Sequence, residues 1–213
     1  AAGLYAGAAL FVFPVMDIYK SAERVCAPVR ALAEQNAQFD LYSLGFSREE
    51  YIYYSKHFHT PVLTDLVGRA SIPPDQIVEM ERIQKSARSA ISKAVRQVPV
   101  TELAAITPEE RATLASAIHN ALRGQEENLT GVLQFEDDLR AELTEFSTRL
   151  QEDTPAFFFV QGEDWRWIVP LLPESLALHV LVHRAVGRDD ALLIANSAGM
   201  ALTADASGQP LQK

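Results

Sequence analysis

The chain has 213 residues, a length that suits one domain or one domain with a large insertion, and its 48% hydrophobic and 22% charged residues argue against disorder. Its formal net charge is -9, and its 19 lysines and arginines are scattered singly along the sequence. Because nucleic-acid binding depends on clustered basic residues that neutralise phosphates, no nucleic-acid partner is expected.

The first segment, residues 1–16, contains an uncharged apolar run that passes directly into a charged stretch at 17–24. This run is shorter than the roughly 20 residues that cross a bilayer as a helix. It also lacks the positively charged start and the small-residue cleavage site of a secretory signal. Two interpretations stay open: the end of a transmembrane helix, or an apolar lead-in that forms a buried first element.

Residues 17–72 alternate between helix and strand patterns. Apolar positions at helical spacing predict a helix over 17–36. Alternating hydrophobicity predicts a strand over 39–44 that ends at Gly45. A capping-box pattern then starts a tyrosine-rich helix, and a short strand is expected at 61–64.

Cys26 is the only cysteine of the chain. A lone cysteine allows neither an intrachain disulfide nor a metal cage of thiolates. No histidine follows it in a recognisable catalytic context, so we expect Cys26 to pack as a small core residue.

Residues 73–153 differ from the rest because three helices are expected here without an intervening strand. The first extends to about Val98, and the second begins with the capping sequence at 107–110. The third spaces its apolar residues almost as heptads from Leu129 to Leu150. The segment also holds 15 acidic and 9 basic residues, and so most of the negative excess. We interpret it as a helical hairpin or three-helix insertion whose apolar stripes contact each other or a partner.

Residues 154–213 return to the mixed pattern. A continuous apolar stretch predicts a fully buried strand over 156–160, followed by a short helix over 162–168. Two further strands, 176–186 and 191–196, are expected to form a hairpin. The order of elements predicts an α/β fold, a mixed sheet flanked by helices, built from the two segments on either side of the helical insertion.

These two segments carry their motifs in a distinctive order. A Lys-Ser pair lies at 20–21, and the tyrosine-rich sequence follows at 48–55. A later apolar strand leads into the acidic and aromatic residues at 163–165, and a hairpin follows at 186–196. This order resembles the soluble extracytoplasmic C-terminal domain of membrane glycosyltransferases that use polyprenyl-phosphate sugars, such as the bacterial aminoarabinose transferases and the protein mannosyltransferase-like enzymes.

The resemblance covers roughly residues 10–65 and 155–196, and residues 73–153 depart from it. It implies that the carboxylate acting on the acceptor lies in loops of the membrane portion, so no residue of this chain is expected to be catalytic. It implies a domain tethered to a membrane on its periplasmic or extracytoplasmic face, and so favours the transmembrane interpretation of residues 1–16. The implied partners are the membrane portion of the same polypeptide and a lipid-linked sugar or glycan acceptor, and no cofactor is expected.

A second function stays open, namely a soluble protein-interaction module that binds a partner helix through the amphipathic insertion 73–153. The heptad-like stripe of the third helix motivates it. A free-standing hydrolase is a weaker alternative, because the sequence has no recognisable signature of a nucleophile and its base.

Arg48, Tyr51, Tyr53 and Tyr54 form the first candidate binding surface. Aromatic side chains beside an arginine suit contact with a glycan, a lipid headgroup or the membrane portion of the same enzyme. The competing interpretation is that Tyr51 and Tyr54, one helical turn apart, pack in the core.

Glu163, Asp164 and Trp165 form the second candidate. The two carboxylates suit either acid–base chemistry or the stabilisation of exposed N–H groups in the first turn of a helix. Because Trp165 and Trp167 lie on different helix faces, at most one of them is expected to be buried, and the other would mark a contact surface.

Two pairs of histidines have spacings that bear on metal binding. His179 and His183 would share a zinc ion on a helix, but four residue steps in a strand separate them by about 13 Å. His57 and His59 follow a helix end, where imidazoles interact with the negative pole of the helix. We therefore expect no metal site.

Overall fold

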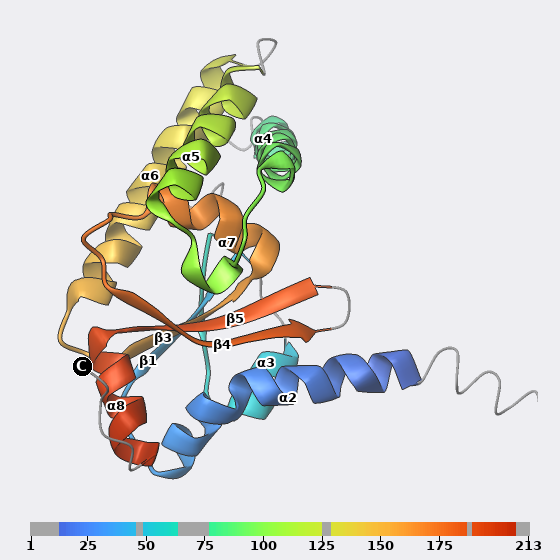
Figure 1. The fold of residues 1–213 in the computed structure, drawn as a ribbon. Helices are drawn as coiled ribbons and strands as arrows, with labels where there is room; N and C mark the ends of the chain where they lie inside the picture. Colours follow the sequence, from blue (N-terminus) through green and yellow to red (C-terminus); the bar gives the residue numbers. More distant parts are fainter. Residues whose placement is uncertain (1–12, 46–48, 64–76, 125–128, 187–188, 208–213) are drawn as a thin grey trace, which may run out of the picture.

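The computed structural model describes residues 13–45, 49–63, 77–124, 129–186 and 189–207. A mixed five-stranded sheet lies between two layers of helices, which confirms the predicted α/β fold class (Figure 1). The strand order is β2-β1-β3-β5-β4, with β1 parallel to β2 and β3, and β5 antiparallel to β3 and β4. The strands are β1 (Asp40–Leu44), β2 (Thr60–Val62), β3 (Ala156–Gln161), β4 (Leu178–Val186) and β5 (Asp189–Asn196). The helices are α2 (Phe13–Glu34), α3 (Glu49–Ser55), α4 (Ile77–Gln97), η3 (Leu103–Ala105), α5 (Pro108–Arg123), α6 (Leu129–Gln151), α7 (Gly162–Ile168), η5 (Val169–Leu171) and α8 (Ser197–Ser207).

The central strand β3 supplies both helical layers with core residues. Phe158 and Val160 belong to the core cluster above the sheet in Figure 1, whereas Phe157 and Phe159 belong to the cluster below it. This division follows from the alternation of side chains along a strand. All four residues are fully buried, which confirms the prediction of a buried strand here.

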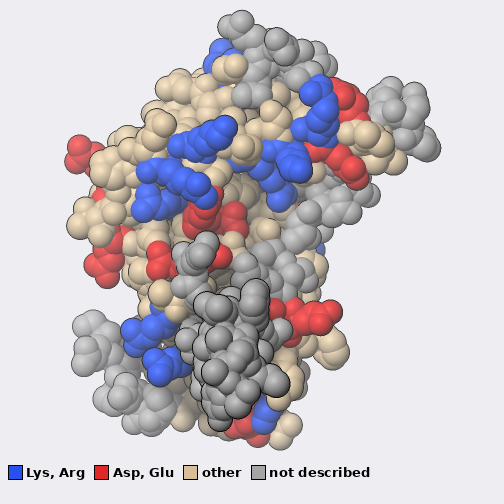
Figure 2. Space-filling model, turned by 90° about the vertical axis from the view of Figure 1, so that its right-hand side faces the viewer, with Lys and Arg blue, Asp and Glu red and all other residues tan. Residues whose placement is uncertain are grey.

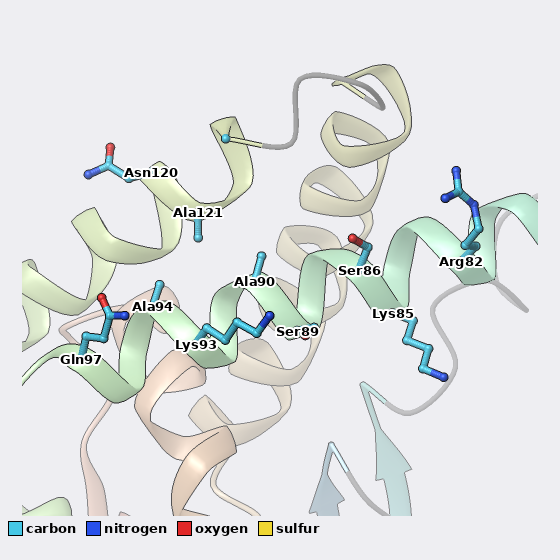
Figure 3. A pocket seen from close by; sticks show the side chains of 11 residues that line it. Arg82, Lys85, Ser86, Ser89, Ala90, Lys93, Ala94, Gln97, Asn120 and Ala121 are labelled. Carbon is cyan, nitrogen blue, oxygen red and sulfur yellow. The ribbon is translucent and has the colours of Figure 1, made fainter.

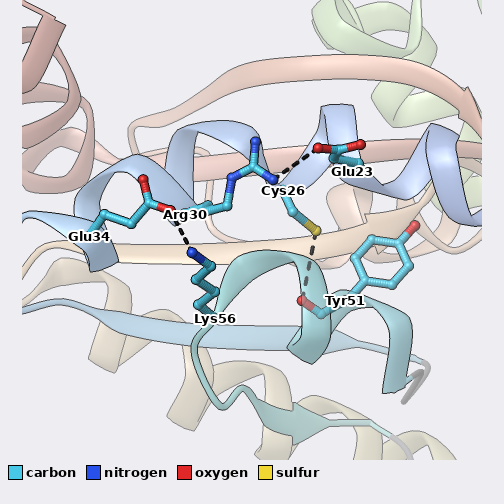
Figure 4. A network of polar contacts seen from close by, with 6 residues as sticks. All are labelled: Glu23, Cys26, Arg30, Glu34, Tyr51 and Lys56. Atoms are coloured by element: carbon cyan, nitrogen blue, oxygen red, sulfur yellow. Dashed lines mark hydrogen bonds and ion pairs between the residues drawn. The ribbon is translucent and has the colours of Figure 1, made fainter.

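The layer below the sheet contains α2, α3 and α8 (Figure 1). Val25 and Val29 of α2 pack in its core, and Cys26 between them is fully buried, as predicted. The Cys26 thiol donates a weak hydrogen bond to the backbone carbonyl of Tyr51, 3.8 Å away, and so joins α2 to α3 (Figure 4). Because α2 begins at Phe13, its helix includes part of the apolar lead-in as well as the predicted helix.

The helix α8 is not predicted by the sequence patterns, because its residues are small and have no apolar stripe. It directly follows Asn196, the last residue of β5. The Asn196 Oδ1 atom accepts hydrogen bonds from the backbone N–H groups of Gly199 and Ala156, at 2.8 and 3.0 Å. One amide side chain therefore fixes the first turn of α8 against the start of β3.

The layer above the sheet contains the three predicted helices α4, α5 and α6, together with α7 (Figure 1). Phe146 of α6 packs edge-on against Tyr42 of β1 and Phe158 of β3, with ring centroids 5.4 Å apart in both pairs. α5 begins with the predicted capping box of Thr107 and Glu110. The apolar stripe of α6 is buried, and its members share one core with the sheet: Val132, Leu139, Leu143, Phe146 and Leu150.

The strands β1 and β3 lie side by side, but the chain leaves them toward opposite faces of the sheet. After β1 it enters α3, whose Tyr51 packs below the sheet. After β3 it enters α7, whose Trp165 packs above the sheet. In open α/β sheets, ligands bind in the crevice at the carboxyl ends of two such strands.

None of the described helices combines the length and the apolar character that a bilayer span requires.

Candidate polar site at the carboxyl edge of the sheet

The carboxyl ends of β1 and β3 meet at Gly45 and Asp164. Gly45 ends β1 with a φ angle of +77°, a conformation that glycine adopts without steric cost. A Cβ atom added at Gly45 would lie 2.9 Å from Oδ2 of Asp164, closer than a normal contact. The turn after β1 therefore leaves room for a carboxylate from the first turn of α7.

Asp164 is held in this crevice by its own helix. The indole Nε1 of Trp167 donates a hydrogen bond to Asp164 Oδ1 at 3.0 Å. Burial raises the pKa of Asp164, although the Trp167 hydrogen bond and the charge of Arg88 act in the opposite direction. The carboxyl group is thus easier to protonate than an exposed aspartate, but Gly45 and Trp167 enclose it on two sides.

A second part of the site fixes the end of β2. Leu63 follows β2 with a φ angle of +63°, which is uncommon for a residue other than glycine. Its backbone N–H donates to Glu142 Oε1 of α6 at 2.7 Å, and its carbonyl accepts a hydrogen bond from Arg88 of α4. Burial lowers the pKa of Arg88, whereas the negative charges of Asp164 and Glu142 raise it. The charges of both carboxylates therefore act on Arg88, which itself holds the end of β2 through the Leu63 carbonyl.

Glu163 connects the same helix α4 to the start of α7. Its carboxylate accepts hydrogen bonds from Ser92 and Arg96. Burial on its own would raise the pKa of Glu163, but the hydrogen bonds from Arg96 and Ser92 outweigh it, so the pKa is lowered. Glu163 and Asp164 are thus neighbours whose pKa values shift in opposite directions.

Beside Glu163, a cavity of about 240 Å³ opens at this edge of the sheet. Side chains of both charges surround it, and its backbone floor includes Gly162 at the start of α7. A Cβ atom at Gly162 would lie 2.8 Å from Cβ of Asp190, so only glycine brings α7 this close to β5. The lining residues are Arg96, Leu103, Gln161, Gly162, Glu163, Arg166, Asp189 and Asp190. Such a cavity suits a small hydrophilic ligand that is held by hydrogen bonds.

The structure places Glu163 and Asp164 of the second candidate in this site, but Trp165 lies beneath it. Trp165 and Trp167 are both buried, at 4% and 5% exposure, so the expectation that at most one of them is buried is wrong. The Trp165 indole reaches down to the core and donates to the carbonyl of Leu103 at 3.0 Å. The Trp167 indole turns back over Asp164, and this polar partner explains its burial.

The first candidate is not part of the same site, because α3 lies on the opposite face of the sheet. Tyr51 is buried against Phe159, with ring centroids 4.9 Å apart, and Tyr54 packs beside the same core cluster. Tyr53 is 76% exposed. Arg48 lies outside the described residues.

Sequence reasoning did not identify the residues that α4 and α6 contribute. On α4, Arg88, Ser92 and Arg96 recur every four residues, a spacing that places them along one line of the helix. This polar line on α4 could have indicated that the helix contacts charged groups. No comparable pattern in the sequence marks Glu142, which lies far along the chain from Arg88.

The histidines form no metal site in the part of the chain that the structure describes, where no cluster of three or more suitable ligands occurs. His179 and His183 both lie on β4, as predicted, and His183 Nε2 is 3.4 Å from Asp190 Oδ1. The His57 ring stacks on Phe39 at 4.5 Å.

No protein-family model matches the chain, and neither a curated protein nor a solved structure is detectably similar to it.

Proposed function

We propose that this chain is the extracytoplasmic domain of a membrane glycosyltransferase that transfers a sugar from a polyprenyl-phosphate donor to a lipid or protein acceptor. One observation carries the proposal beyond the order of the motifs. The two segments that contain the motifs join in one sheet, where β1 pairs with β3 over five residues, from Asp40 with Ala156 to Leu44 with Val160. The family-like motifs thus belong to one folded unit, although 81 residues of helical insertion separate them in sequence.

The proposed role of the domain is to support the chemistry and not to perform it. In this proposal, the catalytic carboxylate lies in the membrane portion of the same polypeptide. The cavity beside Glu163 contacts the hydroxyl groups of the acceptor or a polar loop of the membrane portion, because its charged lining offers both donors and acceptors. Glu142 and Arg88 hold the end of β2, and Trp167 holds Asp164 beside the end of β1, at the same edge of the sheet as the cavity.

The helix α2 supplies the proposed connection to the membrane. It runs as one helix from the apolar lead-in at Phe13 to Glu34, and its second half packs against the sheet. A continuous helix transmits position and orientation better than a flexible linker does. In this proposal the domain is held on the periplasmic or extracytoplasmic face.

The test begins with the native reading frame. We expect a hydrophobic region with several spans upstream of residue 1, and sugar transfer from a polyprenyl-phosphate donor by membranes that contain the whole protein. A frame without such a region would overturn the proposal.

The whole enzyme then tests the cavity. Gln161→Ala removes an amide from the cavity lining, and we expect a higher KM for the acceptor with an unchanged kcat. Gln151→Ala, an exposed change at the end of α6, is the matched control and leaves both constants unchanged. Equal kinetics of the Gln161 variant and the control would show that the cavity does not contact the acceptor.

The interaction-module alternative has less support, because its motivating surface is occupied. The heptad-like stripe of α6 packs against the sheet and the neighbouring helices, so it does not face a partner.

A further inference from the structure

The outer face of α4 has a charge that differs from the rest of the chain. The helix contains five lysines and arginines and two glutamates, whereas the whole chain has a net charge of -9. Figure 2 shows basic side chains gathered across the upper half of one face of the molecule. α4 therefore places a local positive surface on an acidic protein.

A groove of about 690 Å³ runs between α4 and α5 beside these basic residues (Figure 3). Small side chains such as Ala90, Ala94 and Ala121 form its floor, which keeps the groove open. Hydroxyl and amide groups line its sides, from Ser86, Ser89, Gln97 and Asn120. These groups donate hydrogen bonds to an acceptor that enters the groove.

Two of the exposed basic residues of α4 are already paired. Arg82 pairs with Glu79 at 2.6 Å, and Arg96 pairs with Glu163. Lys85 and Lys93 also line the groove, and neither has an acidic partner among the residues that the structure describes. Both side chains are exposed.

The basic face of α4 lies on the side of the molecule where α2 begins. In Figure 1, α4 and the amino-terminal end of α2 lie on the same side of the molecule, and this side faces the viewer in Figure 2. If α2 continues toward a bilayer, as the proposed function has it, the basic face of α4 is turned to that bilayer as well. Anionic lipids attract basic residues near the surface by about 1 kcal/mol for each residue.

We propose that the groove between α4 and α5 binds the phosphate of an anionic lipid headgroup, with Lys85 and Lys93 supplying the positive charge. The hydroxyl group of Ser89 donates a hydrogen bond to a phosphate oxygen. This contact sets the orientation of the domain on the membrane. That part of the inference rests on the proposed function.

The test measures binding of the 213-residue chain to vesicles by co-sedimentation at about 0.1 M salt, where screening is moderate. Vesicles of phosphatidylglycerol and phosphatidylcholine are compared with vesicles of phosphatidylcholine alone, which report any binding through apolar residues. K85Q/K93Q is expected to lower the partition coefficient on the anionic vesicles by about 30-fold, which is the loss of two surface attractions. Binding to phosphatidylcholine stays unchanged.

The control K56Q/R140Q removes the same number of positive charges, one just after α3 and one on α6, and is expected to change binding by no more than about twofold. Equal losses in the two double variants, or no loss in K85Q/K93Q, would overturn the proposal. Complete displacement by inorganic phosphate at the same phosphorus concentration would overturn it in favour of a soluble anion. The proposed function fails on different evidence, namely the upstream reading frame, so the two failures are distinguishable.

Discussion

Both helical layers of this protein carry exposed ion pairs, but they differ in whether charged groups are also buried. Above the sheet, Arg88, Asp164 and Glu142 withdraw from solvent at the carboxyl edge of the strands. Below the sheet, the ion pair within α2 is partly exposed, and the pair between α2 and Lys56, the residue after α3, is more than half exposed. Figure 4 shows Glu23 with Arg30 at 3.0 Å, and Glu34 with Lys56 at 2.7 Å.

The difference indicates which layer depends on its charges. Below the sheet, the core is neutral, and burial raises the pKa of the Cys26 thiol to about 12, so it packs as an uncharged group. Above the sheet, charges lie where desolvation is costly, and such groups destabilise a fold unless each keeps its partner. These desolvated charges lie around the crevice where a ligand is expected. Charged groups with shifted pKa values are typical of functional sites.

Removing one arginine from each layer tests whether the two layers depend on their charges to different degrees. Arg88→Met leaves Asp164 and Glu142 without their nearby cation, and we expect a loss of about 3 kcal/mol in the free energy of unfolding, since Arg88 is half-buried. Arg30→Met removes a pair whose side chains are 30% and 46% exposed and whose remaining carboxylate can be hydrated, so it should cost about 0–1 kcal/mol. Urea denaturation of both variants measures the difference, and equal losses would refute the distinction between the layers.

A smaller effect is expected at Gly45. Gly45→Ala forces a Cβ into a positive-φ position and toward Asp164, so we expect a loss of about 1–2 kcal/mol. Gly124→Ala is the control, because Gly124 has a φ angle of -70° and its nearest contact would be 3.4 Å away. That variant should be neutral or more stable by up to about 1 kcal/mol.

A double-mutant cycle separates the two causes at Gly45. In an Asp164→Ala background the carboxylate is absent. Gly45→Ala should then lose only the stability that the positive φ angle costs, and not the part due to the contact with Asp164. Additive losses would show that Asp164 does not constrain the turn after β1.

The sequence predicts the elements that are strongly periodic or continuously apolar. Phe157 to Val160 identify β3 because a buried strand leaves no polar position, and the stripe of α6 follows from its contacts with one side of the sheet. The order of strands and helices is confirmed for the same reason. Each of these patterns lies within a single short segment, so it can be recognised from the sequence alone.

The candidate site was only partly predictable, because its contacts are long-range. Glu163 and Asp164 could be named from their position in a helix, but Arg88 and Glu142 are each more than 20 residues away from Asp164 in sequence. The burial of Trp167 depends on one hydrogen bond to Asp164, which no periodicity indicates.

Stability should depend on pH through the buried carboxyl group of Asp164 above the sheet. Because burial raises the pKa of Asp164, the folded state holds this proton more tightly than the unfolded chain does. Its contribution is complete below about pH 4 and is lost as the pH rises through the folded-state pKa. Asp164→Asn should remove this loss, with a difference in slope of at most about 1.4 kcal/mol per pH unit.

The stabilisation by Glu110 depends on pH in the opposite direction, because its pKa is lowered in the folded state. Backbone hydrogen bonds from Thr101 and Thr107 lower its pKa from 4.5 to about 2. Its stabilisation is therefore present above pH 4.5 and is lost as the pH falls toward 2. Glu110→Gln should flatten only this acidic limb. Urea midpoints at a series of pH values measure the contributions of Asp164 and Glu110. A profile of the Asp164→Asn variant that runs parallel to that of the wild type would contradict the raised pKa of Asp164.

The smallest effect is expected at the most exposed charges. The hydrogen bond and charge of Lys56 lower the pKa of Glu34, but both side chains are more than half exposed, at 59% and 53%. Solvent screens such a pair, and ordering two long side chains offsets its attraction. Lys56→Gln should therefore give no resolvable shift in the urea midpoint, at low or high salt. A clear loss that disappears in high salt would mean that α2 and α3 depend on charge as the carboxyl edge does, and the contrast between the two layers would fail.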